Sequence, residues 1–305
     1  MSSATAEHDG LVPEQRPTDS TAAGKGALYV VATPIGNLDD ITVRALEVLK
    51  AADIIACEDT RKSRVLLDRW SISTRLMSLH KFSETRKTTT ILERLRLGDN
   101  VALISDAGTP AVSDPGSRLV RVVLDGGFRV IPIPGASSIT AALSASGMEG
   151  ANFVYLGFAP KREAQRKDFF ERIAAEERTS IFFETPTRIL PSLDIAAAVL
   201  GERRVVLMRE LTKIHEEILT GTATDILAIL GARETVKGEI IVLVEGRGRE
   251  PAAVDLTEVV RELIEEGLSG KRLADEAHKR FGVRKSVAYE RFLEMTEGRE
   301  SVETD

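Results

Sequence analysis

Short apolar runs alternate with amphipathic stretches along most of the chain, and this alternation predicts its secondary structure. Runs rich in Val, Ile, Leu and Phe have strand character and lie at 28–32, 53–57, 101–105, 129–133, 153–156, 179–183, 203–208, 217–220 and 240–245. Stretches with helical spacing separate most of these runs, for example at 42–50, 117–125 and 138–146. Strands that alternate with helices predict layered α/β domains, which we place at 27–149 and 150–249.

The two ends of the chain lack the alternation of predicted strands and helices that marks the middle of the chain. Residues 1–26 are mostly small and polar, without the apolar core of a signal peptide, and we expect a disordered tail. After Pro251 the strand pattern stops, and helical spacing follows at 257–266, 271–281 and 285–295. The short turn Gly282-Val283 makes the last two resemble a helix-turn-helix unit. The net charge of this C-terminal part is acidic, which does not favour the recognition of double-stranded nucleic acid. We therefore predict that 250–305 is a helical appendage for packing or docking.

Gly/Pro-rich turns follow three of the predicted strands, within 30–42, 101–110 and 133–138. Each has the pattern of a strand, a sharp turn and a helix start. In α/β sheets, ligands bind outside the carboxyl ends of strands, where loop backbone and helix N-termini converge. Ordinary connections would produce single turns of this kind as well. Three of them, with polar residues at their tips, favour a small-molecule pocket.

Several common sites are excluded by the sequence. The turns contain neither G-x-G-x-x-G nor G-x-x-x-x-G-K-[ST], so the usual dinucleotide and NTPase loops are absent. Cys57 is the single cysteine, which excludes an internal disulfide and a cysteine-based zinc site. His80 and His215 have no partner at metal-ligand spacing, so no metal is expected. No apolar run approaches about 20 residues, so we expect no membrane association and a cytoplasmic protein.

Charge is distributed unevenly along the chain. The formal net charge is −6, yet residues 61–96 carry an excess of seven positive charges. A basic stretch of this density can neutralise phosphates. It can also be a solvated helix face, and the sequence leaves both interpretations open because periodicity does not show whether the charges share a surface.

Eight short sequence blocks, in unbroken order along the chain, carry a family resemblance. The blocks are TPIGNLDDIT at 33–42, EDTR at 58–61, SDAGTP at 105–110, SDPG at 113–116, PGA at 134–136, GFAP at 157–160, RELTK at 209–213 and KGEI at 237–240. Together they resemble the bacterial ribosomal small-subunit cytidine 2′-O-methyltransferases, a branch of the tetrapyrrole-methylase-like superfamily. The first turn is less rich in Gly and Pro than that of relatives acting on tetrapyrroles.

This resemblance implies a fold, a donor and a substrate. The fold would be two α/β domains of the tetrapyrrole-methylase type with a cleft between them, usually in a homodimer. The donor would be S-adenosylmethionine, without a metal. The acceptor would be a cytidine ribose in 16S ribosomal RNA near the decoding centre, within the assembled 30S subunit. The donor contacts expected by similarity are Pro34, Asp106, Gly108, Ser113, Ser137, Ser138, Thr185, Pro186 and Ile240.

A ribose hydroxyl that attacks a methyl group benefits from a positioned base. The candidates for this base are Glu58, Asp59, Glu184 and Lys213. Glu210 is a weaker candidate because Arg209 and Lys213 flank it. For each residue a salt bridge or helix cap is the alternative. The candidates for RNA contacts are Arg61, Lys62, Arg86, Lys87, Arg94, Arg96, Lys161 and Arg188, for which an ordinary surface charge is the alternative.

Two rival functions remain open. One is methylation of a small tetrapyrrole ring, although such a substrate needs only a few cations and not a long basic segment. The other is a donor-binding module that docks on ribosomes without catalysis. Donor binding without methyl transfer to any RNA would identify this second rival.

Overall fold

The computed structural model describes residues 26–80, 84–247 and 255–300. The tail expected at 1–26 lies outside the described residues apart from Gly26. The chain forms two compact units, Met1–Ala141 with Glu210–Glu216, and Ala142–Arg209 with Glu217–Asp305. The domain boundaries at 149 and 249 stay predictions.

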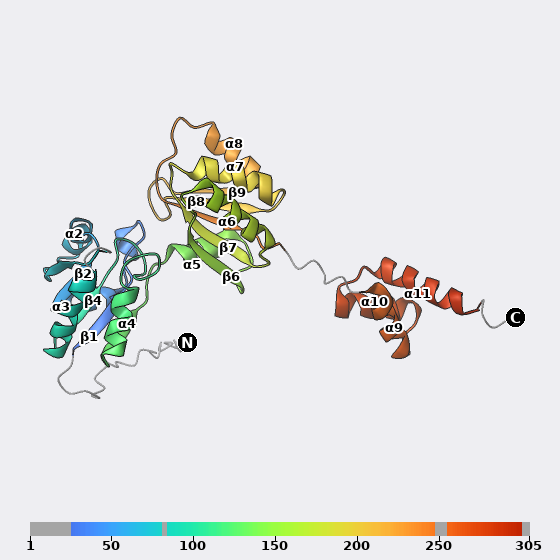
Figure 1. Cartoon of the computed structure of the whole chain (residues 1–305), viewed down its shortest axis with the longest axis horizontal. Coiled ribbons are helices and arrows are strands. Elements are labelled where there is room, and N and C mark those ends of the chain that lie inside the picture. The colour runs from blue at the N-terminus through green and yellow to red at the C-terminus, as the bar shows by residue number, and fades with distance from the viewer. Residues whose placement is uncertain (1–25, 81–83, 248–254, 301–305) are drawn as a thin grey trace, which may run out of the picture. The chain divides into compact units, whose positions relative to one another are not determined.

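The first unit is built on a parallel sheet of five strands in the order β3-β2-β4-β1-β5 (Figure 1). The strands are β1 (Ala27–Val31), β2 (Ile54–Cys57), β3 (Leu76–Ser78), β4 (Val101–Leu103) and β5 (Arg129–Ile133). Their central members are continuous apolar runs because helices cover both faces of the sheet. In the register of the sheet, Leu28 of β1 lies between Val101 and Val130. The three-residue edge strand β3 was not expected from the sequence, since it is too short to show a strand pattern.

Helices pack on both faces of this sheet. On one face, α1 (Val43–Ala51) and α2 (Thr60–Arg69) bury side chains such as Leu49 and Leu67. On the other face, α3 (Glu84–Arg96) and α4 (Ser117–Asp125) bury Leu95 and Val123. Local signals set the helix starts: the Thr42 hydroxyl accepts from the Ala45 N–H at 3.1 Å, an N-cap for α1. The 3₁₀ turn η1 (Leu38–Asp40) precedes it.

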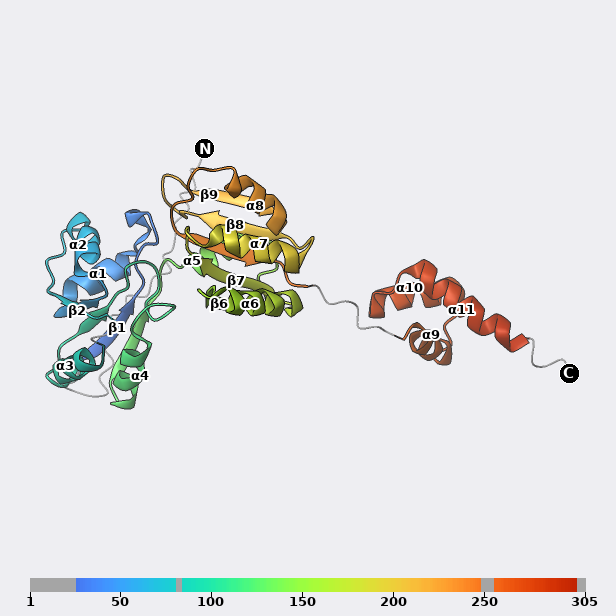
Figure 2. The ribbon, with the colours of Figure 1, turned by 45° about the horizontal axis from the view of Figure 1, so that its top comes forward.

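The second unit has a mixed sheet in the order β6-β7-β10-β8-β9. The strands are β6 (Phe153–Phe158), β7 (Thr179–Glu184), β8 (Val205–Arg209), β9 (Glu217–Gly221) and β10 (Ile240–Val244). Only β6 and β7 run parallel; the other neighbours are antiparallel. One face is covered by α6 (Glu163–Ala175), α7 (Ile189–Leu200) and α8 (Ala223–Gly231) (Figure 2). The helix α5 (Ser138–Ser146) contains the division between the two units.

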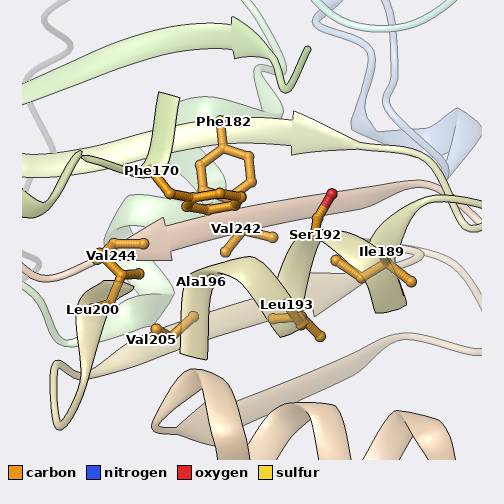
Figure 3. Close-up of a pocket in the computed structure, with 10 residues that line it drawn as sticks. All are labelled: Phe170, Phe182, Ile189, Ser192, Leu193, Ala196, Leu200, Val205, Val242 and Val244. Atoms are coloured by element: carbon orange, nitrogen blue, oxygen red, sulfur yellow. The ribbon is translucent and has the colours of Figure 1, made fainter. Parts of the chain in front are cut away.

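The core beneath α7 contains a small void of about 10 Å³, which is at most large enough for a single water molecule. Figure 3 shows the rings of Phe170 and Phe182 lying against each other beside it. Ser192 is the polar residue among those that line it, and its hydroxyl donates to Glu184 Oε2 at 2.5 Å. An apolar void of this size is a packing feature and too small for a ligand.

The C-terminal helices have a core of their own. They are α9 (Leu256–Glu265), α10 (Gly270–Phe281) and α11 (Lys285–Glu300). Leu263, Leu273 and Ala277 are fully buried among them. Gly282 ends α10 with a φ of 69°, a left-handed conformation that glycine adopts without the strain of a Cβ. The predicted helical appendage is confirmed.

Candidate functional site

The loops that follow β1 and β4 are joined at the carboxyl ends of these neighbouring strands. Thr33 and Gly108 exchange two backbone hydrogen bonds, of 2.9 and 3.0 Å. The Thr33 hydroxyl also donates to the Ser105 carbonyl at 3.2 Å. Gly108 has a φ of 77°, and a Cβ there would lie 3.3 Å from Ile35, so the close pairing depends on glycine.

The turn after β5 joins the same group of loops. The Thr109 hydroxyl donates to the Ala136 carbonyl at 3.3 Å. A Cβ on Gly135 would lie 3.1 Å from the Ala32 methyl group, so the third turn packs closely against the first. The three turns singled out by the sequence therefore meet at one edge of the sheet. Ser137 and Ser138 lie where this third turn enters α5.

The turn after β4 does not lead into a helix, and this part of the sequence prediction is wrong. Residues 107–116 are irregular, and α4 begins only at Ser117. Ala111 and Ser113 have φ values of 67° and 63°, which are unusual for residues with a side chain. Asp106 is therefore not the N-cap of a following helix.

Asp106 instead connects β4 to the turn between β2 and α2. Its Oδ1 accepts from the Asp59 N–H at 3.0 Å, and its Oδ2 lies 2.9 Å from Lys62 Nζ. The Asp106 side chain is 20% exposed and the Lys62 side chain 66% exposed. Asp59 caps α2 by accepting from the Arg61 N–H at 2.8 Å. The structure thus brings together three predicted site residues, Asp59, Lys62 and Asp106. Lys62, predicted as an RNA contact, forms an ion pair with the carboxylate of Asp106.

Two further carboxyl groups belong to this region. Burial raises the pKa of Asp114 to about 6, and the charges of Glu58 and Asp106 act in the same direction, while a hydrogen bond with Ser105 opposes them. Burial also raises the pKa of Glu58, with Asp106 as the next cause. Sequence reasoning missed Asp114, although it stands in the SDPG block beside the predicted Ser113. Perturbed carboxyl groups of this kind concentrate at functional sites.

A pocket of about 260 Å³ opens beside Asp106. Its polar lining comes from Thr33, Lys62, Ser63, Ser105 and Asp106, and its apolar lining from Pro34, Leu38, Val65, Leu66 and Ile104. This mixture of an apolar wall with a few polar groups is typical of small-molecule sites. Pro34 and Asp106 are both predicted donor contacts.

Glu184 occupies a different environment in the second unit. Its side chain is fully buried at the end of β7 and accepts from the Thr185 N–H at 2.7 Å and from Ser192. Arg188 lies 2.8 Å from Oε1 as an ion pair. This bonding favours a structural role for both side chains over the predicted base and RNA contact. Ile240 pairs with Glu184 on the neighbouring strand β10.

The segment Glu210–Glu216 belongs to the first unit and packs on the loop after β1. The Asn37 N–H donates to the Thr212 hydroxyl at 3.0 Å, and a Cβ on Gly36 would lie 2.6 Å from the Lys213 side chain. Lys213 Nζ is 2.9 Å from Glu210 Oε1. This ion pair favours a structural role for Lys213 over the predicted base.

The basic segment at 61–96 has its positive charges on both sides of the first unit's sheet. Its helices α2 and α3 lie on opposite faces, next to the edge strand β3. Arg61, Arg86 and Arg96 are exposed, as is Lys161, two residues before α6. Lys87 is half-buried, and Arg94 lies 2.8 Å from Asp99. The predicted RNA contacts on α2 and those on α3 therefore lie on opposite faces of this sheet.

Metal-binding clusters and membrane-spanning helices are both absent from the described ranges. Among those residues, no group of His, Cys, Asp and Glu side chains is arranged to hold a metal ion. None of the helices in the described part of the chain combines the length and apolar character that crossing a bilayer requires.

Comparison with known proteins identifies the relatives of this chain. A family model for tetrapyrrole (corrin/porphyrin) methylases matches residues 27–227. The ribosomal RNA small subunit methyltransferase I of Mesorhizobium japonicum is 48% identical over 273 residues, which cover 88% of this chain and 92% of the relative. The protein with the same name from Escherichia coli O157:H7 is 45% identical over 275 residues, which cover 89% and 96%.

Solved structures share the fold. The methyltransferase CobJ aligns with a TM-score of 0.56 at 20% identity, covering 72% of this chain and 94% of its own. A diphthine synthase aligns with a TM-score of 0.54 at 16% identity, covering 72% and 89%. These likenesses confirm the predicted fold class, α/β units of the tetrapyrrole-methylase type followed by helices.

The raised pKa of Asp114 predicts a pH-dependent stability. Because the folded pKa of about 6 exceeds the ordinary value of 3.8, the fold gains stability from protonation below pH 3.8 and loses it as pH rises to about 6. Asp114→Asn mimics the protonated group. At pH 7.5 we expect its free energy of unfolding to exceed that of the wild type by about 1–2 kcal/mol, because solvent screens part of the effect of the pKa shift. Near pH 4 the two proteins should be equally stable.

Chemical denaturation of both proteins at several pH values measures this difference. Asp125→Asn, at an exposed position in α4, is the control and should shift stability by the same amount at every pH. A difference for Asp114→Asn that does not change with pH would contradict the prediction.

Proposed function

Because the chain belongs to the tetrapyrrole (corrin/porphyrin) methylases, and within them to the ribosomal RNA small subunit methyltransferase I family, we propose that it methylates small-subunit ribosomal RNA. The near-full-length likeness to the two bacterial relatives carries this proposal. The structures of CobJ and diphthine synthase resemble the chain in fold alone, so they do not favour the tetrapyrrole rival.

The finer proposal concerns the acceptor. We propose the 2′-hydroxyl of a cytidine in 16S RNA near the decoding centre, within the assembled 30S subunit. The block pattern from TPIGNLDDIT to KGEI supports this choice, as do exposed cations around the edge strand β3. Small ribosomal subunits are found in the cytoplasm, and the protein would act there.

S-adenosylmethionine would supply the methyl group, carried on a sulfonium cation. The chemistry of the strand-end loops fits this group, because Asp106, Glu58 and Asp114 concentrate negative charge beside a partly apolar pocket. We propose that the donor is held in the first unit by the predicted residues Pro34, Asp106, Gly108, Ser113, Ser137 and Ser138. From the second unit we propose Thr185, Pro186 and Ile240.

Glu58 is our proposed general base. The other candidates are engaged: Asp59 caps α2, Glu184 is buried with Ser192 and Arg188, and Lys213 is paired with Glu210. Glu58 directly follows β2, and burial raises its pKa, which makes it a stronger base than an ordinary carboxylate. Its task is to take the proton of the attacking hydroxyl, while the surrounding loops align the reacting atoms.

We also propose a homodimer. Large apolar side chains on β6 support it, since Phe153, Leu156 and Phe158 are 37%, 37% and 54% exposed. Apolar groups that gather along one exposed strand are typical of a covered surface.

Methyl transfer to isolated small ribosomal subunits tests the proposed function. With labelled donor and subunits from a strain that lacks this gene, we expect incorporation at one cytidine, at its ribose. Subunits from the parent strain are the control and should accept little label. Mapping the label by nuclease digestion and mass spectrometry shows base and position. Donor binding without transfer to subunits or naked RNA would favour the non-catalytic docking module.

Glu58→Gln tests the assignment of the base. The amide keeps the size of the side chain but cannot accept the proton, so kcat should fall about 10²- to 10⁴-fold. Donor affinity, measured by calorimetry, should change little. Glu93→Gln, an exposed position on α3, is the matched control and should retain full kcat. Equal kcat for Glu58→Gln and the wild type would contradict this role.

Neutralising two cations of α3 tests the RNA surface. We expect Arg86→Gln with Lys87→Gln to weaken binding to small subunits and to reduce the salt slope of log affinity by about 1.4–1.8, because each phosphate contact contributes about 0.7–0.9. The control is Lys167→Gln with Arg172→Gln, which removes two exposed cations of α6. An unaltered slope for the α3 variant, or the same loss in both variants, would refute a specific contact at α3.

A further inference from the structure

The carboxylate expected to receive the donor already holds a cation of the protein. Asp106 Oδ2 lies 2.9 Å from Lys62 Nζ, at the edge of the pocket that both residues line. S-adenosylmethionine brings two cationic groups to this region, the sulfonium and the α-ammonium group of its methionine moiety. Two cations cannot share one carboxylate oxygen without repulsion.

The two partners of this ion pair differ in their freedom to move. Asp106 is held from a second side, because its Oδ1 accepts from the Asp59 N–H at 3.0 Å, and only 20% of its side chain is exposed. Lys62 lies in the first turn of α2 with 66% of its side chain exposed. Its flexible four-carbon stem can turn to solvent, and ion pairs exposed to this degree contribute little to stability. Because its side chain is the more exposed of the two, Lys62 is the partner that can leave Asp106.

We propose that Lys62 is a displaceable counter-ion of Asp106, which the ammonium group of the donor replaces, and that the released Lys62 then binds a phosphate of the RNA. This inference rests on the proposed function. In the donor-free protein, Asp106 neutralises Lys62. With donor bound, the Lys62 charge adds to that of the neighbouring exposed Arg61. Donor binding would thus increase RNA affinity, and by linkage RNA would increase donor affinity by the same factor.

The proposal predicts a change in the salt dependence of RNA binding, because this dependence follows the number of phosphate contacts. Release of one cation adds one contact, so the salt slope of RNA binding should steepen by about 0.7–0.9 when the donor is present. A general tightening of the protein by the donor would raise RNA affinity without this change of slope.

The experiment measures binding of small ribosomal subunits, from a strain lacking the gene, at several salt concentrations. S-adenosylhomocysteine is the probe, since it has the ammonium group but no methyl group to transfer. 5′-Methylthioadenosine is the comparison, because it has the nucleoside without the amino acid. For the wild type we expect S-adenosylhomocysteine to raise RNA affinity about fivefold or more and to steepen the slope, and methylthioadenosine to do neither.

Two variants identify the residue. Lys62→Met should bind S-adenosylhomocysteine alone up to about fivefold more tightly, because no side chain competes for Asp106, and its RNA affinity should not respond to the probe. Arg61→Met is the matched control on the same turn. It should lower RNA affinity with and without the probe by the same factor, and keep the response.

Three results would overturn the inference. The first is equal RNA affinity of the wild type with and without bound S-adenosylhomocysteine. The second is weaker binding of this probe to Lys62→Met, which would place Lys62 on the donor carboxylate. The third is a full response to the probe in Lys62→Met. In all three the proposed function stands, whereas a wild-type protein that binds neither S-adenosylmethionine nor its homocysteine analogue would overturn both.

Discussion

Two backbone hydrogen bonds between Thr33 and Gly108 join the loops that follow neighbouring strands β1 and β4, and the candidate site is arranged around them. A parallel sheet brings the carboxyl ends of its strands to one edge, but the loops there need their own bonds to keep a fixed shape. The left-handed backbone of Gly108 allows this pairing, and the Thr33 hydroxyl adds a bond to Ser105. The position of Asp106, between Ser105 and Gly108, follows from it.

Three carboxyl groups lie close enough together at this edge of the sheet for their charges to interact. Glu58, Asp106 and Asp114 influence one another, and burial raises the pKa of two of them. Lys62 and the Asp59 N–H satisfy Asp106. A group of carboxyl groups with a displaceable cation suits a cationic ligand, whose binding relieves their mutual repulsion.

The contrast between Glu58 and Glu184 shows how position determines the use of the same side chain. Glu58 directly follows the buried strand β2, and Glu184 is the last residue of β7. Glu184 is enclosed and bonded by Thr185, Ser192 and Arg188, so its charge is compensated within the fold. Glu58 is partly exposed beside other carboxylates, and its raised pKa fits the base role that we propose for it.

The sequence by itself determined the strand and helix pattern, the helical C-terminal part and the three turns of the site, because these depend on local periodicity and on glycine, proline and capping residues. It also pointed to Asp106, through the block in which that residue stands. Only the tertiary structure decided which charges meet. Lys62 and Asp106 are 44 positions apart, and α2 and α3 lie on opposite faces of one sheet. It also revealed β3, the irregular segment before α4 and the raised pKa of Asp114. Burial and through-space charge produce such features, and neither is encoded in the spacing of residues along the chain.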